Sequence, residues 1–153
     1  MTALLSTRGA ISVEYLIASL PVMLFFASVW QLADLYAAHL IVQRAASAAG
    51  RAASVVLPDD PHYYGGAEVN AFAGARKTQI ELAANLVLRA SPKILAQPEV
   101  TIEGASGAGP LTATVRARVR CFPGWGSLVC GADGLQTLTG AARYPYHGAK
   151  YKY

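Results

Sequence analysis

The sequence places one carboxylate at the start of a long apolar stretch. Glu14 lies five positions after Gly9, and no side chain from Tyr15 to Ala33 is charged. A charged side chain in a membrane-spanning helix typically costs about 2.5–3.5 kcal/mol at the helix centre and less towards its edge. Two interpretations are open: the carboxylate reaches the headgroup boundary, or it pairs with a cation.

A cut after Gly9 would supply such a cation. It would leave Ala10 with a new α-amine at the membrane surface, and Glu14 would become the fifth residue of the mature chain. Pairing of this carboxylate with the amine of an adjacent subunit would offset the charge only on assembly, and so would fix the register of neighbouring helices. Under this interpretation the mature chain would begin at Ala10.

Two cysteines could also react with each other. Cys121 and Cys130 lie at the two ends of a short stretch that contains a proline and two glycines. A hairpin-like loop could bring the two sulfurs together, and in an exported domain we expect a disulfide. Closing so short a loop stabilises the fold by about 2–3 kcal/mol. The alternative, a zinc site, needs more ligands than the sequence offers, because there is no second cysteine pair and the next histidine is His147.

No pattern of residues predicts catalysis. His39, His62 and His147 lie far apart, and the sequence has no phosphate-binding loop, nucleophile motif or zinc-protease motif. We expect a chain that is not an enzyme and that holds no metal and no cofactor. The net charge of +4 is scattered along the chain, so we expect no nucleic acid as a partner.

The apolar stretch predicts the element that positions Glu14. The 19 residues from Tyr15 to Ala33 would form about 29 Å of helix, which matches one hydrocarbon thickness. We expect a single membrane-spanning segment at about residues 14–33, with Pro21 kinking it; a cleaved secretory signal is the alternative. The short leader favours an N-terminus in the cytoplasm and a periplasmic C-terminal domain.

The helical pattern continues to Leu57, so we expect one helix over residues 10–57. A stripe of mostly small residues follows one face of its second half at three- and four-residue steps. We expect this stripe to pack against copies of the chain or its relatives, and the alternative is that the C-terminal half folds back over it. The stripe consists of Leu35, His39, Val42, Ala46, Ala49 and Ala53.

Residues 58–153 predict a small domain of one helix and an antiparallel sheet, which makes the fold class α+β. The helix is expected at about residues 68–90, and strands at 99–104, 111–121 and 136–143. The face expected to be buried in that helix carries Val69, Phe72, Ala73, Ile80, Ala83, Leu86 and Val87.

The middle strand has the clearest pattern. Its residues alternate strictly between small or apolar side chains from Leu111 to Cys121 and polar ones that include Arg116, Arg118 and Arg120, which predicts one buried and one wet face. The three arginines could dock an acidic partner, lipid headgroups or a polyanion. The alternative is a solvated strand face that discourages aggregation.

Taken together, residues 8–21 resemble the processing motif of type IV prepilins. Glu14 followed by Tyr15 after a short leader is similar to the Tad (tight adherence, Flp-type) branch. The Arg8-Gly9 start, Glu14 and Pro21 in the span resemble TadE-like minor pilins or pseudopilins. The length of 153 residues also fits a TadE- or TadF-like chain, because major pilins of the branch are far shorter and TadG-like relatives much longer.

The resemblance implies a role for each of these residues. Gly9 and Ala10 would flank the cleavage site of a prepilin peptidase, and residues 1–9 would be the leader. Glu14 and Tyr15 would act in processing or assembly. The implied partners are other pilin subunits through the N-terminal helix, the inner-membrane assembly platform and the lipid bilayer. The implied place is the bacterial inner membrane and later the cell surface.

The function implied is that of a structural subunit in pilus assembly, adhesion or secretion. The alternative is a single-pass, membrane-anchored periplasmic binding module or adhesin that joins no filament.

Overall fold

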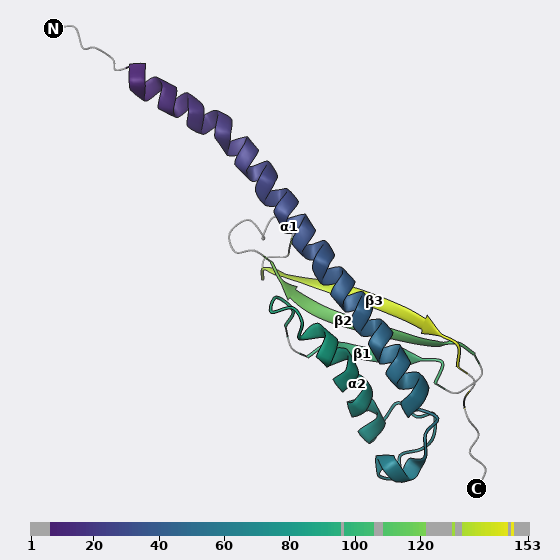
Figure 1. The fold of residues 1–153 in the computed structure, drawn as a ribbon. Coiled ribbons are helices and arrows are strands. Elements are labelled where there is room, and N and C mark those ends of the chain that lie inside the picture. The colour runs from purple at the N-terminus through teal and green to yellow at the C-terminus, as the bar shows by residue number, and fades with distance from the viewer. Residues whose placement is uncertain are drawn as a thin grey trace, which may run out of the picture.

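A long helix carries a small two-layer domain on its C-terminal half (Figure 1). This computed structural model describes residues 7–95, 97–105, 109–121, 130, 133–146 and 148. The elements in chain order are the helix α1 (Thr7–Val56), the 3-10 helix η1 (Pro61–Tyr64), the helix α2 (Gly74–Leu88), and the strands β1 (Glu99–Glu103), β2 (Leu111–Arg120) and β3 (Leu135–Tyr144).

The three strands form one antiparallel sheet in the order β1-β2-β3. The predicted strands at 99–104, 111–121 and 136–143 are confirmed to within one residue at each end. Along β2 the alternating residues Leu111, Ala113, Val115, Ala117 and Val119 are all buried, because this face meets the helices. With two helices beside an antiparallel sheet, the predicted α+β fold class is confirmed.

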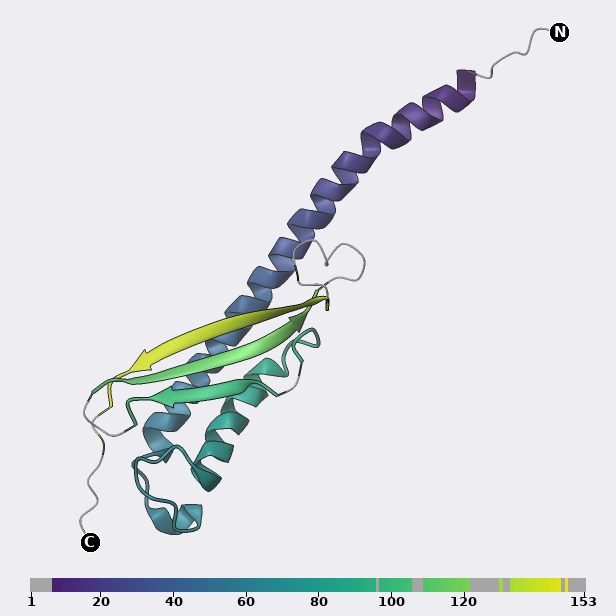
Figure 2. The ribbon, with the colours of Figure 1, turned by 180° about the vertical axis from the view of Figure 1, so that it is seen from behind.

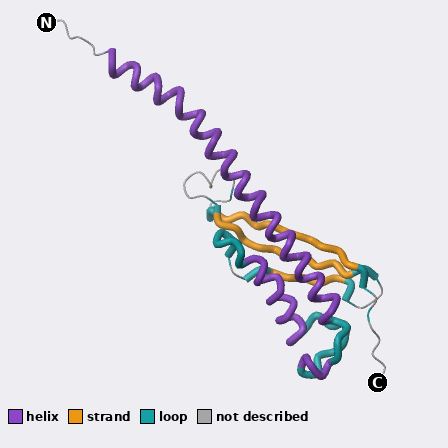
Figure 3. Tube along the Cα trace, viewed as in Figure 1, coloured by secondary structure: helices purple, strands orange, loops and turns teal. Residues whose placement is uncertain are grey.

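Both helices cover the same face of the sheet. The C-terminal half of α1 crosses that face and α2 lies beside it, while the N-terminal half of α1 extends away from the domain (Figures 1 and 2). Figure 3 shows the helices together on one side of the strands. The core therefore lies between the second half of α1, α2 and the inner face of β2.

The small residues of α1 let the sheet approach its backbone closely. A Cβ atom built on Gly50 would lie 2.5 Å from two ring carbons of Tyr144 on β3. The hydroxyl of that tyrosine donates a hydrogen bond to the carbonyl oxygen of Ser47, one turn away, at 3.0 Å. The glycine thus makes room for the ring, and the ring holds β3 against α1.

The structure shows what covers the stripe of small residues on α1. Val42, Ala46, Ala49 and Ala53 are fully buried in the core of this same chain. The expectation that the stripe packs against other copies is therefore wrong, and the alternative is correct: the C-terminal half folds back over it. The physical reason is that alanines on α1 allow both a sheet and a second helix to come into contact with it.

The second helix begins later than predicted, at Gly74 rather than near residue 68, and ends at Leu88. Residues before it are held in turns by tertiary hydrogen bonds. Asn70, at a φ of 63°, donates its backbone N–H to the carbonyl oxygen of Leu57 at 2.8 Å, and its side-chain oxygen accepts from the Tyr146 hydroxyl. The first bond ties the segment to the end of α1 and the second ties it to Tyr146 after β3, and the positive φ of Asn70 is incompatible with a helical turn.

The buried face of α2 also differs from the predicted one. It carries Arg76, Ile80, Ala84 and Leu88 at steps of four, whereas Leu86, expected to be buried, is 63% exposed. The sequence pattern misleads here because a fully buried arginine occupies the first position of the face. Arg76 donates to the carbonyl oxygens of Val56 and Leu57, and so satisfies the end of α1.

Candidate functional site

The N-terminal half of α1 is an exposed apolar surface. Its large side chains are mostly about half to three-quarters exposed, and the most apolar stretch of the helix has a mean hydropathy of 1.9 with only 6% of it buried. Within the described residues, α1 is the one helix that is long and apolar enough to cross a membrane. The exposed apolar residues before Ala33 are Val13, Tyr15, Leu16, Ile17, Leu20, Val22, Met23, Phe25, Phe26, Val29, Trp30 and Leu32.

The predicted assembly residues lie at the free end of this surface. Gly9 and Ala10 fall inside α1, whose first described residue is Thr7, so no break in the helix marks the expected cleavage site. Glu14 and Tyr15 are both exposed, Tyr15 at 72%. Among the described residues, none forms an ion pair or hydrogen bond with the Glu14 carboxylate. The carboxylate is therefore accessible to a group outside this chain.

Pro21 does not interrupt the helix. α1 runs continuously from Thr7 to Val56 with the proline inside it, and it curves gently over its N-terminal half (Figure 2). The kink expected at this residue stays a prediction. Glycines and prolines are tolerated in membrane helices when neighbouring groups satisfy the freed carbonyl.

Cys121 and Cys130 lie at the end of the domain from which the exposed N-terminal half of α1 extends. Cys121 and Cys130 are joined in a disulfide with their Cα atoms 6.5 Å apart, and both are buried. The side-chain amide of Gln31 on α1 lies 3.8 Å from the Cys130 sulfur. The disulfide therefore joins the residue after β2 to Cys130, and Cys130 in turn contacts the buried Gln31 of α1. The residues between the two cysteines lie outside the described part of the chain.

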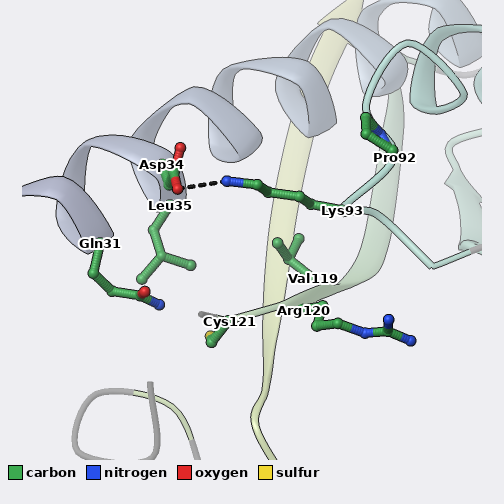
Figure 4. Close-up of a pocket in the computed structure, with 8 residues that line it drawn as sticks. All are labelled: Gln31, Asp34, Leu35, Pro92, Lys93, Val119, Arg120 and Cys121. Atoms are coloured by element: carbon green, nitrogen blue, oxygen red, sulfur yellow. Dashed lines mark hydrogen bonds and ion pairs between the residues drawn. The ribbon is translucent and has the colours of Figure 1, made fainter. Parts of the chain in front are cut away.

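A pocket of about 230 Å³ adjoins this disulfide (Figure 4). Leu35, Val119 and Cys121 form its apolar surface, and Lys93 forms an ion pair with Asp34 on its wall. The guanidinium of Arg120 is turned away from Gln31. The residues that line the pocket are Gln31, Asp34, Leu35, Pro92, Lys93, Val119, Arg120 and Cys121.

The three arginines of β2 differ in their partners. Arg116 lies 3.9 Å from the Glu99 carboxylate, and Arg118 lies 3.2 Å from that of Asp133. Within the described residues, Arg120 has no acidic partner. Because both ion pairs are more than half exposed, each contributes little to stability. Carboxylates therefore neutralise Arg116 and Arg118, whereas Arg120, next to the pocket, keeps its charge unpaired within the described residues.

The described residues contain no group of three or more histidine, cysteine or acidic side chains that could hold a metal ion. His39 is half-buried on α1 and His62 is exposed in η1, where the Asp60 carboxylate accepts the backbone N–H of His62 at 2.9 Å and so starts that turn. His147 lies outside the described residues.

Sequence reasoning missed the pocket itself. Asp34 and Lys93 are 59 positions apart, and neither stood out as a site residue. One feature of the sequence could have pointed to the pocket: Asp34 is the first charged residue after Glu14. Such a charge marks the level at which a spanning helix re-enters polar surroundings.

Comparisons with protein-family models, with curated proteins and with solved structures found no match for this chain. Its own geometry defines a class: an exposed apolar helix, able to span a membrane, whose second half is the spine of a small disulfide-bonded α+β domain.

Proposed function

We propose that this protein is a minor pilin or pseudopilin of a Tad-type type IV pilus, a structural subunit that acts in pilus assembly, adhesion or secretion. The observation that carries the proposal is the exposed first half of α1, where Glu14 is the only charged residue between Arg8 and Asp34. An apolar helix with one accessible carboxylate near its end can lie in a bilayer before assembly and can pack against the apolar helices of other subunits afterwards.

The division of α1 supports this function. One face of its second half is buried by the chain's own domain, whereas nearly all of the described first half is exposed, so the first half offers other subunits the larger apolar surface. The domain itself is attached rigidly, because α1 packs against both α2 and the sheet. A subunit of this design can leave the membrane without refolding, since its exposed helix exchanges lipid for neighbouring helices.

In this proposal, residues 1–9 are a leader on the cytoplasmic side, and a prepilin peptidase cuts between Gly9 and Ala10. The domain lies in the periplasm, where the disulfide is stable. The Glu14 carboxylate pairs with the α-amine of a neighbouring subunit during assembly. Other pilin subunits, the inner-membrane assembly platform and the bilayer are the partners.

A second candidate function is a membrane-anchored periplasmic binding module or adhesin that joins no filament. The observation that favours it is that the small-residue stripe of α1, expected to contact other copies, is covered by the chain itself. In a filament subunit the Glu14 carboxylate pairs with a neighbouring subunit, whereas in a binding module that joins no filament it has no such partner. A substitution at Glu14 therefore distinguishes the two functions.

The test compares Glu14→Ala with Ser19→Ala in cells that make the peptidase. Ser19 is a matched control because, within the described residues, its hydroxyl donates a hydrogen bond only to the carbonyl of Leu16 in the same helix. We expect both variants to insert in the membrane, but only Glu14→Ala to lose crosslinks to other pilin subunits in native envelopes. Intact mass should show a chain that begins at Ala10. Crosslinks unaffected by Glu14→Ala, or a retained leader, would contradict the proposal.

A further inference from the structure

The sheet ends in two edge strands, and the longer of them is β3. Hydrogen bonding alternates along an antiparallel strand pair. On β2, the N–H of Arg120 donates to the carbonyl of Lys93, and the carbonyl of Arg118 accepts from Leu95 on the same side. Both bonds point to the β1 side, so the residues of β3 opposite these two arginines turn their backbone groups away from β2. By this alternation the outer edge of β3 carries the N–H and carbonyl groups of Thr137, Thr139, Ala141 and Arg143.

The outer edge of β3 lacks the features that usually block one. Its ten residues pair with β2 in unbroken register and include no proline or lysine, whereas natural edge strands are commonly short, bulged, covered or interrupted by such residues. The side-chain amide of Gln43 donates to the Ala141 carbonyl at 3.3 Å, and among the described residues no other hydrogen bond reaches this edge. β3 can therefore accept a further strand.

β1 is the opposite edge and runs in the same direction as β3, because each is antiparallel to β2. Thr101 of β1 lies opposite Thr114, whose backbone groups point towards β1 as those of Arg118 do. The two neighbours of Thr101 therefore turn their backbone groups outward, and these neighbours are Val100 and Ile102. Two copies of the sheet can thus join as a parallel pair, with β3 of one beside β1 of the other.

Two unpaired charges lie on these edges at the same level of the sheet. Glu103 of β1 and Arg143 of β3 both lie opposite Thr112 of β2. Both are exposed, and neither forms an ion pair within the described residues. A second copy displaced sideways by the width of the sheet would place its Glu103 directly beside Arg143, where opposite charges on adjacent strands attract.

The backbone hydrogen bonds fit the same displacement. It sets Thr101 of the second copy opposite Ala141, because both lie opposite the same residue of β2. In a parallel ladder a residue bonds to the two neighbours of the residue opposite it, so Ala141 would donate to the Val100 carbonyl and accept from the Ile102 N–H. The Ala141 carbonyl has a second lone pair for this bond, beside the one that Gln43 uses. Charges and backbone thus select one register.

The direction of the strands keeps both copies in one membrane. Gly140 on β3 adjoins Val42 on α1. Further along both elements Tyr144 adjoins Gly50, so β3 and α1 run the same way. Pairing β3 with β1 therefore leaves the two α1 helices parallel, and both can cross a bilayer from the same side. Antiparallel pairing of two β3 strands would turn one helix around and would leave Glu103 unpaired.

The helix layer offers apolar side chains to the same contact. α2 lies on the β1 side of α1 (Figures 1 and 2), so α2 of the second copy would come beside α1 of the first. Tyr36 and Leu40 lie two turns and one turn before Gln43 on α1 and are exposed, as are Leu82 and Leu86 on α2. Two helices spaced ~8–10 Å are wider than three strands spaced ~4.8 Å, so neighbouring copies have to rotate and a row of them curves.

We infer that β3 of one copy binds β1 of a second copy as a parallel strand pair, with Arg143 beside Glu103. The interface is heterologous, so it repeats and joins copies in a row instead of closing a dimer. This inference rests on α1 spanning a membrane. It goes beyond the proposed function, because it needs neither cleavage after Gly9 nor the carboxylate of Glu14.

The test mixes two single-cysteine variants of the full-length chain, Thr101→Cys and Ala141→Cys, in lipid vesicles and adds a short crosslinker that reacts with free thiols. The native cysteines are joined to each other and do not react. We expect crosslinked dimers from the mixture and monomers from either variant alone, since each contact joins residue 101 to residue 141. Equal dimer formation by one variant alone, or no dimers in the mixture, would overturn the inference.

Charge reversal tests the register. Arg143→Glu or Glu103→Arg, introduced into both chains, should lower crosslinking about fivefold because attraction becomes repulsion, and the double reversal should restore it. Arg120→Glu is the matched control, since Arg120 is also exposed and without an acidic partner among the described residues but lies on the middle strand. An equal loss in this control, or no recovery in the double reversal, would contradict the strand pairing.

The vesicles contain no peptidase and no other pilin, so a failure of the pilin proposal leaves this result unaffected. Glu14→Ala should keep the wild-type crosslinking between residues 101 and 141. A loss in Glu14→Ala as large as that in Arg143→Glu would mean that the membrane helices hold the copies together, and it would overturn the inference.

Discussion

Gly140 on β3 lies directly against the backbone of Val42 on α1. A Cβ atom at Gly140 would stand 2.7 Å from the Val42 carbonyl oxygen and 2.9 Å from the Cα of Gln43, closer than such atoms can approach. The absence of a side chain at one position of β3 therefore sets the distance between the sheet and the helix. Because α1 is also the proposed membrane anchor, this contact determines how firmly the domain is fixed to that anchor.

The first prediction follows from that contact. Gly140→Ala should destabilise the domain by about 1–3 kcal/mol, the usual range for overpacking, because the obstructing atoms are helix backbone and cannot rotate aside. Denaturant unfolding of the full-length chain in detergent measures the change. Gly109→Ala is the control, since a Cβ there meets no described residue within 4 Å. Equal stability of the two variants would show that α1 shifts freely over the sheet.

The sheet was predictable from the sequence because its signal is local. The strict alternation from Leu111 to Cys121 fixes both the element and its buried face, since only a strand places every second side chain on one side. The small-residue stripe on α1 was different. Its periodicity shows that a face is buried but not what covers it, and the cover proved to be the chain's own sheet and second helix.

The start of α2 and the pocket depend on long-range contacts, which a local pattern does not contain. Residues 68–73 were expected to be helical, yet the hydrogen bond of Asn70 to Leu57 holds a turn at residues 69–70, and Ala73 is extended. The ion pair between Asp34 and Lys93 likewise joins residues 59 positions apart. Neither contact has a signature in the neighbouring sequence, so both required the structure.

The second prediction concerns Arg76, which is fully buried. Its guanidinium donates to the carbonyl oxygens of Val56 and Leu57 at the end of α1, and to those of Asp59 and Ala67 in the following turns. Arg76→Met should lower the free energy of unfolding by about 3 kcal/mol or more, because one buried and three half-buried carbonyl groups lose a charged donor.

Two other variants sharpen this test. Arg76→Lys should restore little stability, since an ammonium lacks the planar fork that reaches carbonyls on several sides. The neighbouring Lys77→Met removes a partly exposed ion pair with Glu81 at 3.7 Å and a cation–π contact with Phe72 at 5.9 Å from the ring centroid, and should cost under about 1 kcal/mol. If Arg76→Lys were as stable as the wild type, the hydrogen-bond geometry assigned to the guanidinium would be wrong.

The third prediction concerns the disulfide between Cys121 and Cys130. Reduction should lower the free energy of unfolding by about 2–3 kcal/mol, because the unfolded chain gains the freedom that the short loop removed. Thermal unfolding with and without reductant measures this effect. The double variant Cys121→Ala/Cys130→Ala should show no response to reductant. Two reactive thiols in denatured, unreduced protein would contradict the bond.

The last prediction concerns alkaline pH. Tyr146 is buried, its hydroxyl donates to the Asn70 side chain, and burial raises the pKa of this phenol above its ordinary value of 10.0, although the nearby charge of Arg76 lowers it in part. Below pH 10 the phenol is protonated in both states, so its full contribution to stability is present. Above pH 10 the unfolded chain releases the proton while the folded chain retains it, and stability falls until the raised pKa is reached.

The wild type should therefore lose up to about 1.4 kcal/mol of unfolding free energy per pH unit above 10 through this group. Tyr146→Phe should be about 1 kcal/mol less stable at neutral pH because it lacks the hydrogen bond, but its stability should fall less steeply above pH 10. Tyr63→Phe, at a residue that is 76% exposed, should follow the wild-type profile. A Tyr146→Phe profile as steep as that of the wild type would show that Tyr146 does not cause the alkaline loss.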